Sequence, residues 1–345
     1  MQNQKIGVLL VNLGTPQSPE KKDVARYLKE FLMDGRVIDI PWFFRFLLIY
    51  LIIVPFRSKK SSNAYKSVWL QKGSPLLVYS ENCTEKVKSF LGEEKYVVEL
   101  CMRYQTPSVA NAVQNCLKQN VSQFIVLPLF PQYSSAASGS ALEKVYKEIS
   151  SHWNVLPVTT VKPFYNHPAF IQCFVNRIKK SFDDISPDHI LFSYHGLPER
   201  HILKSQCGEK NVCFSTPNCC DQIQNDNAHC YRAQCIATTS AIASQMNLEQ
   251  NSYSNSFQSR LGRTKWIEPY TDEVLPQLAK KGIKKLLIVC PAFVADCLET
   301  LEEIEIRAKE EWLACGGKEL CLVPSLNAEP DWVESLAQII KEHSV

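Results

Sequence analysis

The stretch that decides the fold is His189-Ile-Leu-Phe-Ser-Tyr-His-Gly-Leu-Pro198, in which an apolar run leads directly into a histidine and a Gly-x-Pro turn. The run predicts a buried strand, and Gly196 and Pro198 supply the backbone freedom and the stop that a turn needs. In open α/β sheets, ligands bind outside the carboxyl ends of the strands. His195 therefore occupies a position typical of an active site, where an imidazole accepts a proton or ligates a metal near neutral pH. A histidine that only hydrogen-bonds a loop is the alternative.

The same pattern, an apolar run followed by Gly-x-Pro, recurs near the start of the chain. Val8-Leu-Leu-Val-Asn-Leu-Gly-Thr-Pro16 is a second apolar run that ends in Gly-x-Pro. The runs at 124–130 and 286–293 also resemble each other, because each contains a proline and leads through a turn into a helical pattern. Strand-like runs alternate with helical patterns along the chain, which predicts an α/β fold with parallel sheets.

Two similar Rossmann-like halves whose strand ends face one cleft are the predicted architecture. The first half covers residues 1–162, the second covers 163–327, and a helix within 328–345 packs back on the first half. Strands are expected at 6–11, 97–102, 123–128, 155–161, 189–194, 252–257 and 285–290, and helices at 19–32, 139–150, 168–182, 231–246, 296–314 and 330–342.

Composition narrows the class of protein. The net charge is +3 and no block of lysine or arginine is present, so nothing in the charge pattern indicates a nucleic-acid partner. The start of the chain shows no signal-peptide pattern. Fourteen cysteines in a chain without an export signal are expected as thiols or metal ligands rather than disulfides. We therefore expect a cytoplasmic protein.

Residues 41–56 form an apolar segment, Pro41-Trp-Phe-Phe-Arg-Phe-Leu-Leu-Ile-Tyr-Leu-Ile-Ile-Val-Pro-Phe56. The segment is too short between its prolines to span a bilayer, and it contains Arg45. One interpretation is an ordinary core helix. The other is an exposed apolar lip that holds an apolar ligand or rests peripherally on the inner face of a membrane. The aromatic residues after Pro41 and the nearby Arg57 favour the lip.

A ladder of carboxylates follows the last predicted strand. Asp296, Glu299 and Glu303 fall at i, i+3 and i+7 of the next predicted helix. The structural alternative is a capping box, with Asp296 as N-cap and Glu299 as its partner. Together with His195 at the opposing strand end, however, the carboxylates complete a histidine and glutamate pair across the cleft. Imidazole and oxygen ligands suit a labile divalent iron or a proton relay.

Short segments spread over nearly the whole chain carry a family resemblance. They are Val11-Asn-Leu-Gly-Thr-Pro16, Gly73-Ser-Pro75, Leu127-Pro-Leu-Phe-Pro-Gln-Tyr-Ser134, Ser193-Tyr-His-Gly-Leu-Pro198, Phe257-Gln-Ser-Arg260 with Trp266, Pro269-Tyr-Thr-Asp-Glu273 and Asp296-Cys-Leu-Glu-Thr-Leu301. In order and spacing they resemble the ferrochelatases. The resemblance implies a class II chelatase-like fold and a lyase that inserts Fe²⁺ into protoporphyrin IX to give protoheme, the last step of heme biosynthesis.

The resemblance also implies roles for individual residues. His195 and Glu299 would form the central metal or proton pair, with Glu303 behind them. The residues that would touch the macrocycle or its propionates are Arg57, Arg103, Tyr104 and Trp266, and those on the opposite wall are Ser134 and Ser135. Many relatives have histidine two residues before the ladder glutamate, whereas this chain has Cys297, which argues against a relay that needs an imidazole there.

Residues 205–235 form a cysteine-rich insertion, Cys207-x5-Cys213-x5-Cys219-Cys220-x9-Cys230-x4-Cys235. The absence of C-x-x-C pairs weakens a zinc ribbon, although zinc and no metal stay as alternatives. The insertion resembles the internal cysteine segment of bacterial ferrochelatases that carry a [2Fe-2S] cluster, which needs four thiolates. The expected ligands are Cys207, Cys220, Cys230 and Cys235, with Cys213 and Cys219 as alternatives.

Other functions fit parts of this pattern. A chelatase of the same architecture could act on coproporphyrin, or insert cobalt into a sirohydrochlorin, but the apolar lip favours the less carboxylated protoporphyrin. A protein that only binds heme or an iron–sulfur cluster needs no paired base and carboxylate. The pairing of His195 with Glu299 therefore argues against a non-catalytic protein.

Overall fold

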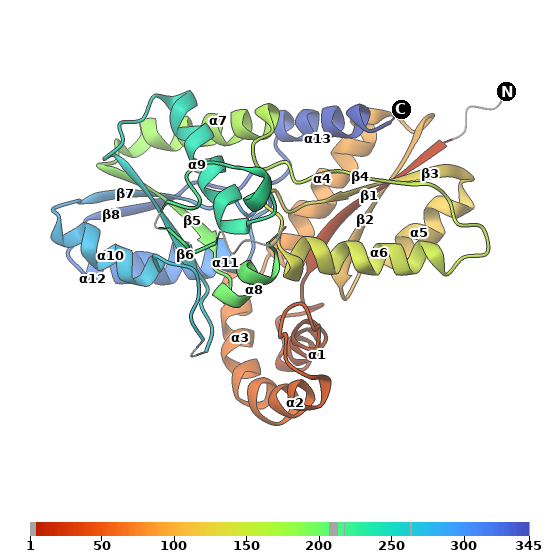
Figure 1. Cartoon of the computed structure of the whole chain (residues 1–345), viewed down its shortest axis with the longest axis horizontal. Helices are drawn as coiled ribbons and strands as arrows, with labels where there is room; N and C mark the ends of the chain where they lie inside the picture. Colours follow the sequence, from red (N-terminus) through yellow and green to blue (C-terminus); the bar gives the residue numbers. More distant parts are fainter. Residues whose placement is uncertain (1–4, 207–212, 217, 263, 345) are drawn as a thin grey trace. The chain divides into compact units, whose positions relative to one another are not determined.

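The computed structural model describes residues 5–206, 213–216, 218–262 and 264–344. The chain divides into two compact units (Figure 1). Unit 1 comprises Met1–Phe130, Ser134–Lys162 and Asn327–Val345, and unit 2 comprises Pro131–Tyr133 and Pro163–Leu326. Each unit contains a four-stranded parallel sheet. The predicted α/β fold with two Rossmann-like halves is confirmed.

Unit 1 is built on the strand order β2-β1-β3-β4. Its strands are β1 (Lys5–Gly14), β2 (Tyr96–Tyr104), β3 (Val121–Pro128) and β4 (Val158–Thr160). Its helices are α1 (Lys21–Leu32), α2 (Trp42–Leu47), α3 (Val54–Val68), α4 (Pro75–Leu91), α5 (Val109–Lys118), α6 (Ser140–Ser150) and α13 (Pro330–Glu342), with π-helical segments at Leu48–Ile53 and Ser135–Gly139.

Helices cover both faces of this sheet, which explains its continuous apolar strands. Leu9 and Val11 of β1 pack in one cluster with residues of α5 and α6. The side chains of a strand alternate between the two faces, so the equally buried Val8 and Leu10 point to the other face. The C-terminal helix α13 packs on α4, and the ammonium of Lys86 on α4 donates to the carbonyl oxygen of Ala328 at 2.7 Å.

Unit 2 repeats the topology with the order β6-β5-β7-β8. Its strands are β5 (His189–His195), β6 (Tyr253–Gln258), β7 (Lys285–Val289) and β8 (Glu319–Leu322). Its helices are α7 (Pro168–Ile185), α8 (Glu199–Lys204), α9 (Tyr231–Met246), α10 (Thr271–Lys280), α11 (Leu298–Thr300) and α12 (Lys309–Ala314), with a 3₁₀ turn at Asn225–Asn227 and a π-helical segment at Leu301–Ala308. In both units the first strand lies between the second and the third, as the internal sequence repeat predicts.

Every predicted strand and helix is present, although the helices α3, α4, α5, α8 and α10 were not among those predicted. Two further details differ. The strand β8 was not predicted, because four residues that alternate between buried and partly exposed are too short to give a periodic signal. The helix predicted at 296–314 begins at Leu298, and its middle is π-helical rather than α-helical. This second difference changes how the carboxylate ladder is held.

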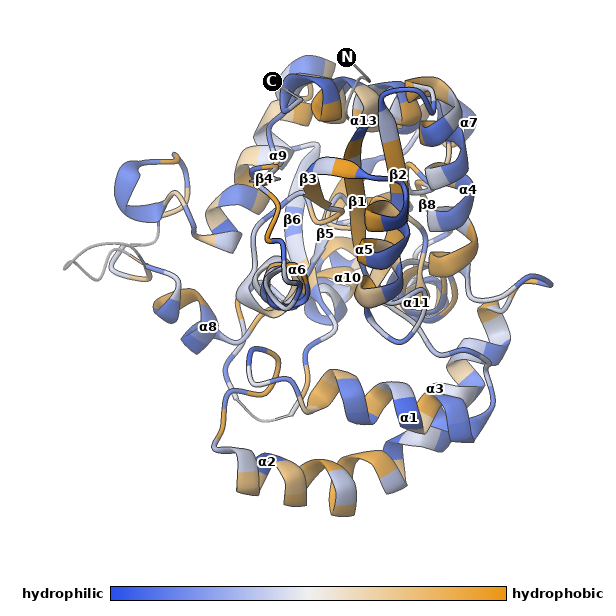
Figure 2. Ribbon diagram, turned by 90° about the vertical axis from the view of Figure 1, so that its right-hand side faces the viewer, coloured by the Kyte–Doolittle hydropathy of each residue, from blue (hydrophilic) through white to orange (hydrophobic). Residues whose placement is uncertain are grey.

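The apolar segment 41–56 lies on the surface of unit 1. Trp42, Phe44 and Phe56 are 62%, 62% and 80% exposed, and only Ile49 and Val54 are buried. Figure 2 shows the hydrophobic colouring along α2 and the helical turns that follow it. The interpretation as an ordinary core helix is therefore wrong. Among the described residues, no helix is both long and apolar enough to cross a membrane.

Candidate active site

The imidazole of His195 lies at the carboxyl end of β5 and is held in a defined orientation. Its Nδ1 atom lies 2.6 Å from the carbonyl oxygen of Gly196. In the neutral ring, Nδ1 donates its proton to this carbonyl, which leaves Nε2 as the unprotonated nitrogen. The rings of Trp266 and Phe293 have centroids 6.5 and 6.4 Å from that of His195. The contact with Gly196 therefore fixes the orientation of the ring and, in its neutral form, the tautomer.

The backbone beside His195 is also fixed. The hydroxyl of Tyr231 donates to the carbonyl oxygen of His195 at 2.9 Å, and the amide of Gly196 donates to the carbonyl oxygen of Gln258 at 2.8 Å. A Cβ atom on Gly196 would lie 2.9 Å from that Gln258 oxygen and 3.2 Å from the ring of Trp266. Glycine is needed here because two other groups approach the backbone closely.

Gln258 connects the end of β5 to the carboxylate helix. It is the residue of β6 that pairs with His195. Its side-chain nitrogen donates to the carbonyl oxygen of Glu299 at 2.8 Å and to Oε2 of Glu303 at 3.4 Å. Its Oε1 accepts from the hydroxyl of Ser193 at 2.7 Å. A single buried amide therefore joins the strand that carries the histidine to the segment that carries both glutamates.

Glu303 is held by several hydrogen bonds from β6 and the residue that follows it. Besides the contact with Gln258, it accepts hydrogen bonds from the amide of Ser259 at 2.9 Å and from the hydroxyl of the same residue. Sequence reasoning did not single out Gln258 or Ser259 individually. The signal was available, since both belong to the matching segment Phe257-Gln-Ser-Arg260.

The start of the helix differs from the predicted capping box. The N-cap is Cys297, and the hydroxyl of Thr300 accepts from its amide at 3.0 Å. Asp296 is buried, and its Oδ1 accepts from the hydroxyl of Thr300 at 3.0 Å and from the amide of Ser325 at 3.2 Å. The capping-box pairing of Asp296 with Glu299 is therefore wrong. Asp296 holds the helix start through Thr300, and Glu299 is not its capping partner.

Cys297 stands next to Glu299 as a neutral group. Burial, the charge of Glu299 and a hydrogen bond to it hold the pKa of the Cys297 thiol well above its ordinary value. The thiol therefore remains protonated at neutral pH and donates to the carboxylate instead of competing with it as a base.

A small cavity borders Glu303. Its volume is about 160 Å³, and its charged lining consists of Arg260, Asp272, Glu303, Arg307 and Glu311. Arg260 is paired with Asp272 at 2.9 Å, and Arg307 with Glu302 at 2.9 Å. Burial and the charge of Asp272 raise the pKa of Glu311. The cavity thus continues the line of carboxylates beyond Glu303.

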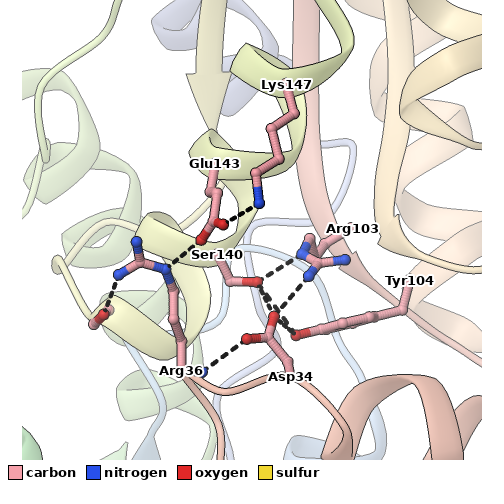
Figure 3. Close-up of polar contacts among 8 residues, drawn as sticks. Asp34, Arg36, Arg103, Tyr104, Ser140, Glu143 and Lys147 are labelled. Atoms are coloured by element: carbon pink, nitrogen blue, oxygen red, sulfur yellow. Dashed lines mark hydrogen bonds and ion pairs between the residues drawn. The ribbon is translucent and has the colours of Figure 1, made fainter.

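In unit 1, Arg103 and Tyr104 meet at the carboxylate of Asp34 (Figure 3). Oδ2 of Asp34 accepts from Nη2 of Arg103 at 2.7 Å, from the hydroxyl of Tyr104 at 2.9 Å and from that of Ser140. Oδ1 accepts from the amide of Arg36 at 2.8 Å. Burial acts to raise the pKa of Asp34, but these hydrogen bonds and the charge of Arg103 outweigh it, so the pKa is lowered.

Arg103 also lines a larger cavity of about 560 Å³. The lining residues are Arg26, Lys29, Glu30, Met33, Asp34, Tyr50, Arg103 and Gln105. Pockets of this size accommodate cofactor-sized ligands. Tyr104 is fully buried and does not contribute to the lining. Its hydroxyl holds Asp34, whereas the guanidinium of Arg103 borders the space itself.

The remaining candidates from the sequence lie at the π-helical segment Ser135–Gly139 and on α3. Ser134 is the N-cap of the π-helical segment before α6 and accepts from the amide of Ala137 at 3.1 Å. The hydroxyl of Ser135 accepts from Arg36 at 2.9 Å. Arg57 is exposed on α3. Ser134, Ser135, Arg57, Arg103 and Tyr104 thus belong to unit 1, and the other candidates belong to unit 2.

The cysteine segment brings several thiols together. Cys207 lies outside the described residues. The sulfur atoms of Cys219 and Cys220 are 3.6 Å apart. A hydrogen bond with Cys230 and, next, burial raise the pKa of Cys220, and Cys213 also hydrogen-bonds with Cys230.

Cys235 is set apart from these four thiols by its place inside α9. It is fully buried and hydrogen-bonds with Tyr231, although its thiol is electrostatically coupled to Cys220. Within the part of the chain that the structure describes, no group of three or more histidine, cysteine or acidic side chains has the arrangement of a metal site.

Known structures share this fold. SirB from Bacillus subtilis with Fe³⁺ aligns with a TM-score of 0.51 and 14% identity over 99% of this chain and 96% of that one. The sirohydrochlorin chelatase SirB from Bacillus subtilis subspecies spizizenii, in complex with cobalt, gives a TM-score of 0.55 at 11% identity with the same coverage. At such low identity these likenesses show the fold alone.

Sequence comparison is more specific. The family model for ferrochelatase matches residues 5–344. A ferrochelatase from Coxiella burnetii (strain Dugway 5J108-111) is 48% identical over 340 residues, which cover 99% of this chain and 94% of that protein. A ferrochelatase from Legionella pneumophila subsp. pneumophila (strain Philadelphia 1) is 46% identical over 336 residues, with 97% and 98% covered. The chain therefore belongs to the ferrochelatase family.

Proposed function

We propose that His195 is the base that removes pyrrole protons during metal insertion, with Glu299 and Glu303 as the carboxylates that complete the site. As a ferrochelatase, the chain is a lyase that inserts Fe²⁺ into a porphyrin for heme synthesis. The observation that carries the assignment of the base is the contact between Nδ1 of His195 and the carbonyl of Gly196, which leaves Nε2 available.

The chemistry requires both a base and an acceptor for cations. A free-base porphyrin carries two pyrrole protons, and Fe²⁺ replaces them, so that Fe²⁺ + protoporphyrin IX → protoheme + 2 H⁺. Neutral His195 takes a pyrrole proton at Nε2. Glu299, half-buried on the adjacent helix start, offers carboxylate oxygens to Fe²⁺ or to the second proton.

Glu303 and the cavity beyond it supply a route for protons. Its carboxylate is fixed by three hydrogen bonds, and Asp272 and Glu311 line the same cavity. The raised pKa of Glu311 brings that carboxyl closer to the pH at which it exchanges protons with water. Protons would leave from Glu303 in the direction of Glu311.

For the porphyrin we propose protoporphyrin IX, which has two propionates. Unit 1 would contribute the cavity beside Arg103, and Arg57 would pair with a propionate through a bidentate bond. Arg103 is already paired with Asp34, and Arg26 with Asp23 at 3.2 Å. Because these two cations of the cavity are partly neutralised, the lining fits a weakly carboxylated ring better than coproporphyrin.

The other porphyrin contacts are assigned by position. Ser134 and Ser135 precede α6 in unit 1, and Trp266 flanks the imidazole of His195 in unit 2. The exposed lip at 41–56 would grip the edge of the apolar ring and rest on a membrane surface. The exposure of Trp42 and Phe44 supports this, because large apolar side chains left in water are typical of such contacts.

We also propose that the cysteine segment binds a [2Fe-2S] cluster, which takes four thiolates. The support is the proximity of thiols in this segment: Cys219 lies beside Cys220, and Cys213 and Cys220 each hydrogen-bond with Cys230, although the described side chains do not have the arrangement of a metal site. The thiols would release their protons on binding. Metal insertion is redox-neutral, so the cluster would supply structural stability to the segment rather than electrons.

One assay tests the base and the porphyrin together. Purified protein is incubated without oxygen with Fe²⁺ and either protoporphyrin IX or coproporphyrin, and product formation is followed by absorbance. His195→Ala should abolish insertion while porphyrin binding, measured by fluorescence, is retained. Activity of His195→Ala within a few-fold of wild type would show that His195 is not the base. Faster turnover of coproporphyrin than of protoporphyrin IX would show that coproporphyrin is the better substrate.

A further inference from the structure

Tyr231 makes a contact with His195 that the proposed chemistry does not use. It is the first residue of α9, and its side chain is buried. Its hydroxyl donates to the carbonyl oxygen of His195 at 2.9 Å. The same side chain hydrogen-bonds with the thiol of Cys235 on the next turn of the helix.

The first turn of α9 is anchored independently of this contact. The side chain of Gln234 accepts from the amide of Tyr133 at 2.7 Å and donates to the carbonyl of Ala228 at 2.7 Å. Cys230, the N-cap of α9, immediately precedes Tyr231. Tyr231 therefore stands on a fixed turn, and the last loop thiol of the cysteine segment is its direct neighbour.

The peptide group between His195 and Gly196 is held from three directions. The hydroxyl of Tyr231 donates to its carbonyl oxygen, and the backbone carbonyl of Gln258 accepts from its amide. Nδ1 of His195 in turn bonds to the carbonyl of Gly196, the next one along the chain. Rotation of this peptide group would turn the imidazole with it. Of these contacts, the one made by Tyr231 on α9 comes from outside the sheet.

We infer that Tyr231 is a positioning residue for the reaction: its hydroxyl fixes the His195 peptide group and links the cysteine segment to the imidazole. The inference rests on the assignment of His195 as the base in the proposed function. Tyr231 acts through His195 and needs no contact with porphyrin or iron. Its loss should therefore reduce turnover without weakening porphyrin binding.

The chain offers a matched control. Tyr194 is also fully buried, and its hydroxyl bonds to that of Thr239 on α9 at 2.8 Å. Tyr194→Phe and Tyr231→Phe thus each remove a buried phenol that bonds between β5 and α9. Only the second touches the His195 peptide group. A purely structural role predicts the same effect for both.

The experiment compares Tyr231→Phe, Tyr194→Phe and His195→Ala in the anaerobic Fe²⁺ and protoporphyrin assay, with kcat and KM measured separately. Melting temperature and iron content are recorded for each. Tyr231→Phe should lower kcat by about tenfold, because misorientation of a catalytic group costs at least this much, with KM for porphyrin unchanged. Tyr194→Phe should lower the melting temperature similarly but leave kcat near wild type.

The outcomes separate the two levels of the assignment. Equal kcat values for the two phenylalanine variants, with His195→Ala inactive, would overturn the role of Tyr231 and leave the base in place. A rise in KM with unchanged kcat would also overturn it, since that result indicates ligand binding rather than orientation. An active His195→Ala would instead overturn the proposed base, and the role of Tyr231 with it.

Discussion

Replacing Asp34 with asparagine should destabilise unit 1 far more than its conservative size suggests. If the asparagine oxygen keeps the amide of Arg36, its NH₂ group faces the donors of Arg103 and Tyr104 where a carboxylate oxygen stood. Nη2 of Arg103 and the hydroxyl of Tyr104, both mostly buried, then lose this acceptor, while Ser140 still contacts each side chain. The hydroxyl of Ser140 can turn to compensate in part, but a guanidinium has no acceptor to offer.

The size of the effect follows from burial. The side chains of Arg103 and Asp34 are only 18% and 8% exposed. Removing one partner of a buried ion pair costs about 3–5 kcal/mol, and we take about 3 kcal/mol because Arg103 borders a cavity that water enters. In a unit of this size each kcal/mol lowers the melting temperature by about 2–4 °C, so the expected decrease is about 6–12 °C.

Glu143→Gln is the matched control, since Glu143 belongs to the same network but its side chain is 39% exposed and bonds Arg36 at 2.7 Å. Exposed pairs contribute about 0–1 kcal/mol. Urea and thermal unfolding followed by circular dichroism would measure both variants. Equal losses for Asp34→Asn and Glu143→Gln would refute the reasoning.

The pH dependence provides a second check on Asp34. Its pKa is lowered in the folded protein, so its contribution is fully present above the unfolded value of about 3.9 and is lost as pH falls through the folded pKa. The stability difference between wild type and Asp34→Asn should therefore be constant around neutral pH and shrink only in acid. A difference that grows on acidification would contradict this sign.

Three further changes test the other regions. Phe43→Ser with Phe44→Ser should weaken porphyrin binding and leave the circular dichroism spectrum and melting curve intact, because both side chains are exposed; cooperative unfolding would show that they belong to a core. Cys230→Ser should remove the red-brown colour and acid-labile sulfide of anaerobically purified protein and should also lower kcat. In a Tyr231→Phe background, Cys230→Ser should lower kcat little further. Stoichiometric zinc without sulfide would exclude the cluster. Gly196→Ala should lower kcat by about tenfold or more through displacement of the imidazole, because its Cβ would lie 2.9 Å from a backbone oxygen; unchanged turnover would show that the strand end relaxes freely.

Most of the fold could be predicted from sequence because parallel strands covered on both faces read as continuous apolar runs. The runs at β1 and β5 are clear for this reason, and the repeated Gly-x-Pro turn indicated the internal symmetry. The strand β8 gave no such signal, since it is short and lies at the edge of its sheet. Hydropathy alone does not show whether an apolar segment such as 41–56 packs against other elements or stays exposed.

The residues of the candidate site could be predicted only where the side chain is itself a reactive group. His195 and the glutamates stand out because an imidazole or a carboxylate at a strand or helix end suggests a reaction. Gln258 and Tyr231 do not, because amides and phenols become significant only through partners 41 and 36 residues away in the chain. The alternative of a capping box at Asp296 and Glu299 was wrong for a similar reason, since part of the hydrogen bonding of Asp296 comes from the distant Ser325.

The place of α13 in the fold has a consequence for biosynthesis. This helix belongs to unit 1, yet it follows the whole of unit 2 in the chain. Trp332, Leu336 and Ile340 are buried, and α13 packs on α4. While α13 is still inside the ribosomal tunnel, the surface of α4 that it covers stays open to water and to chaperones. Unit 1, whose first residues are translated before unit 2, is thus completed only after unit 2 has been translated, in contrast to the usual order in which N-terminal domains finish folding ahead of those that follow.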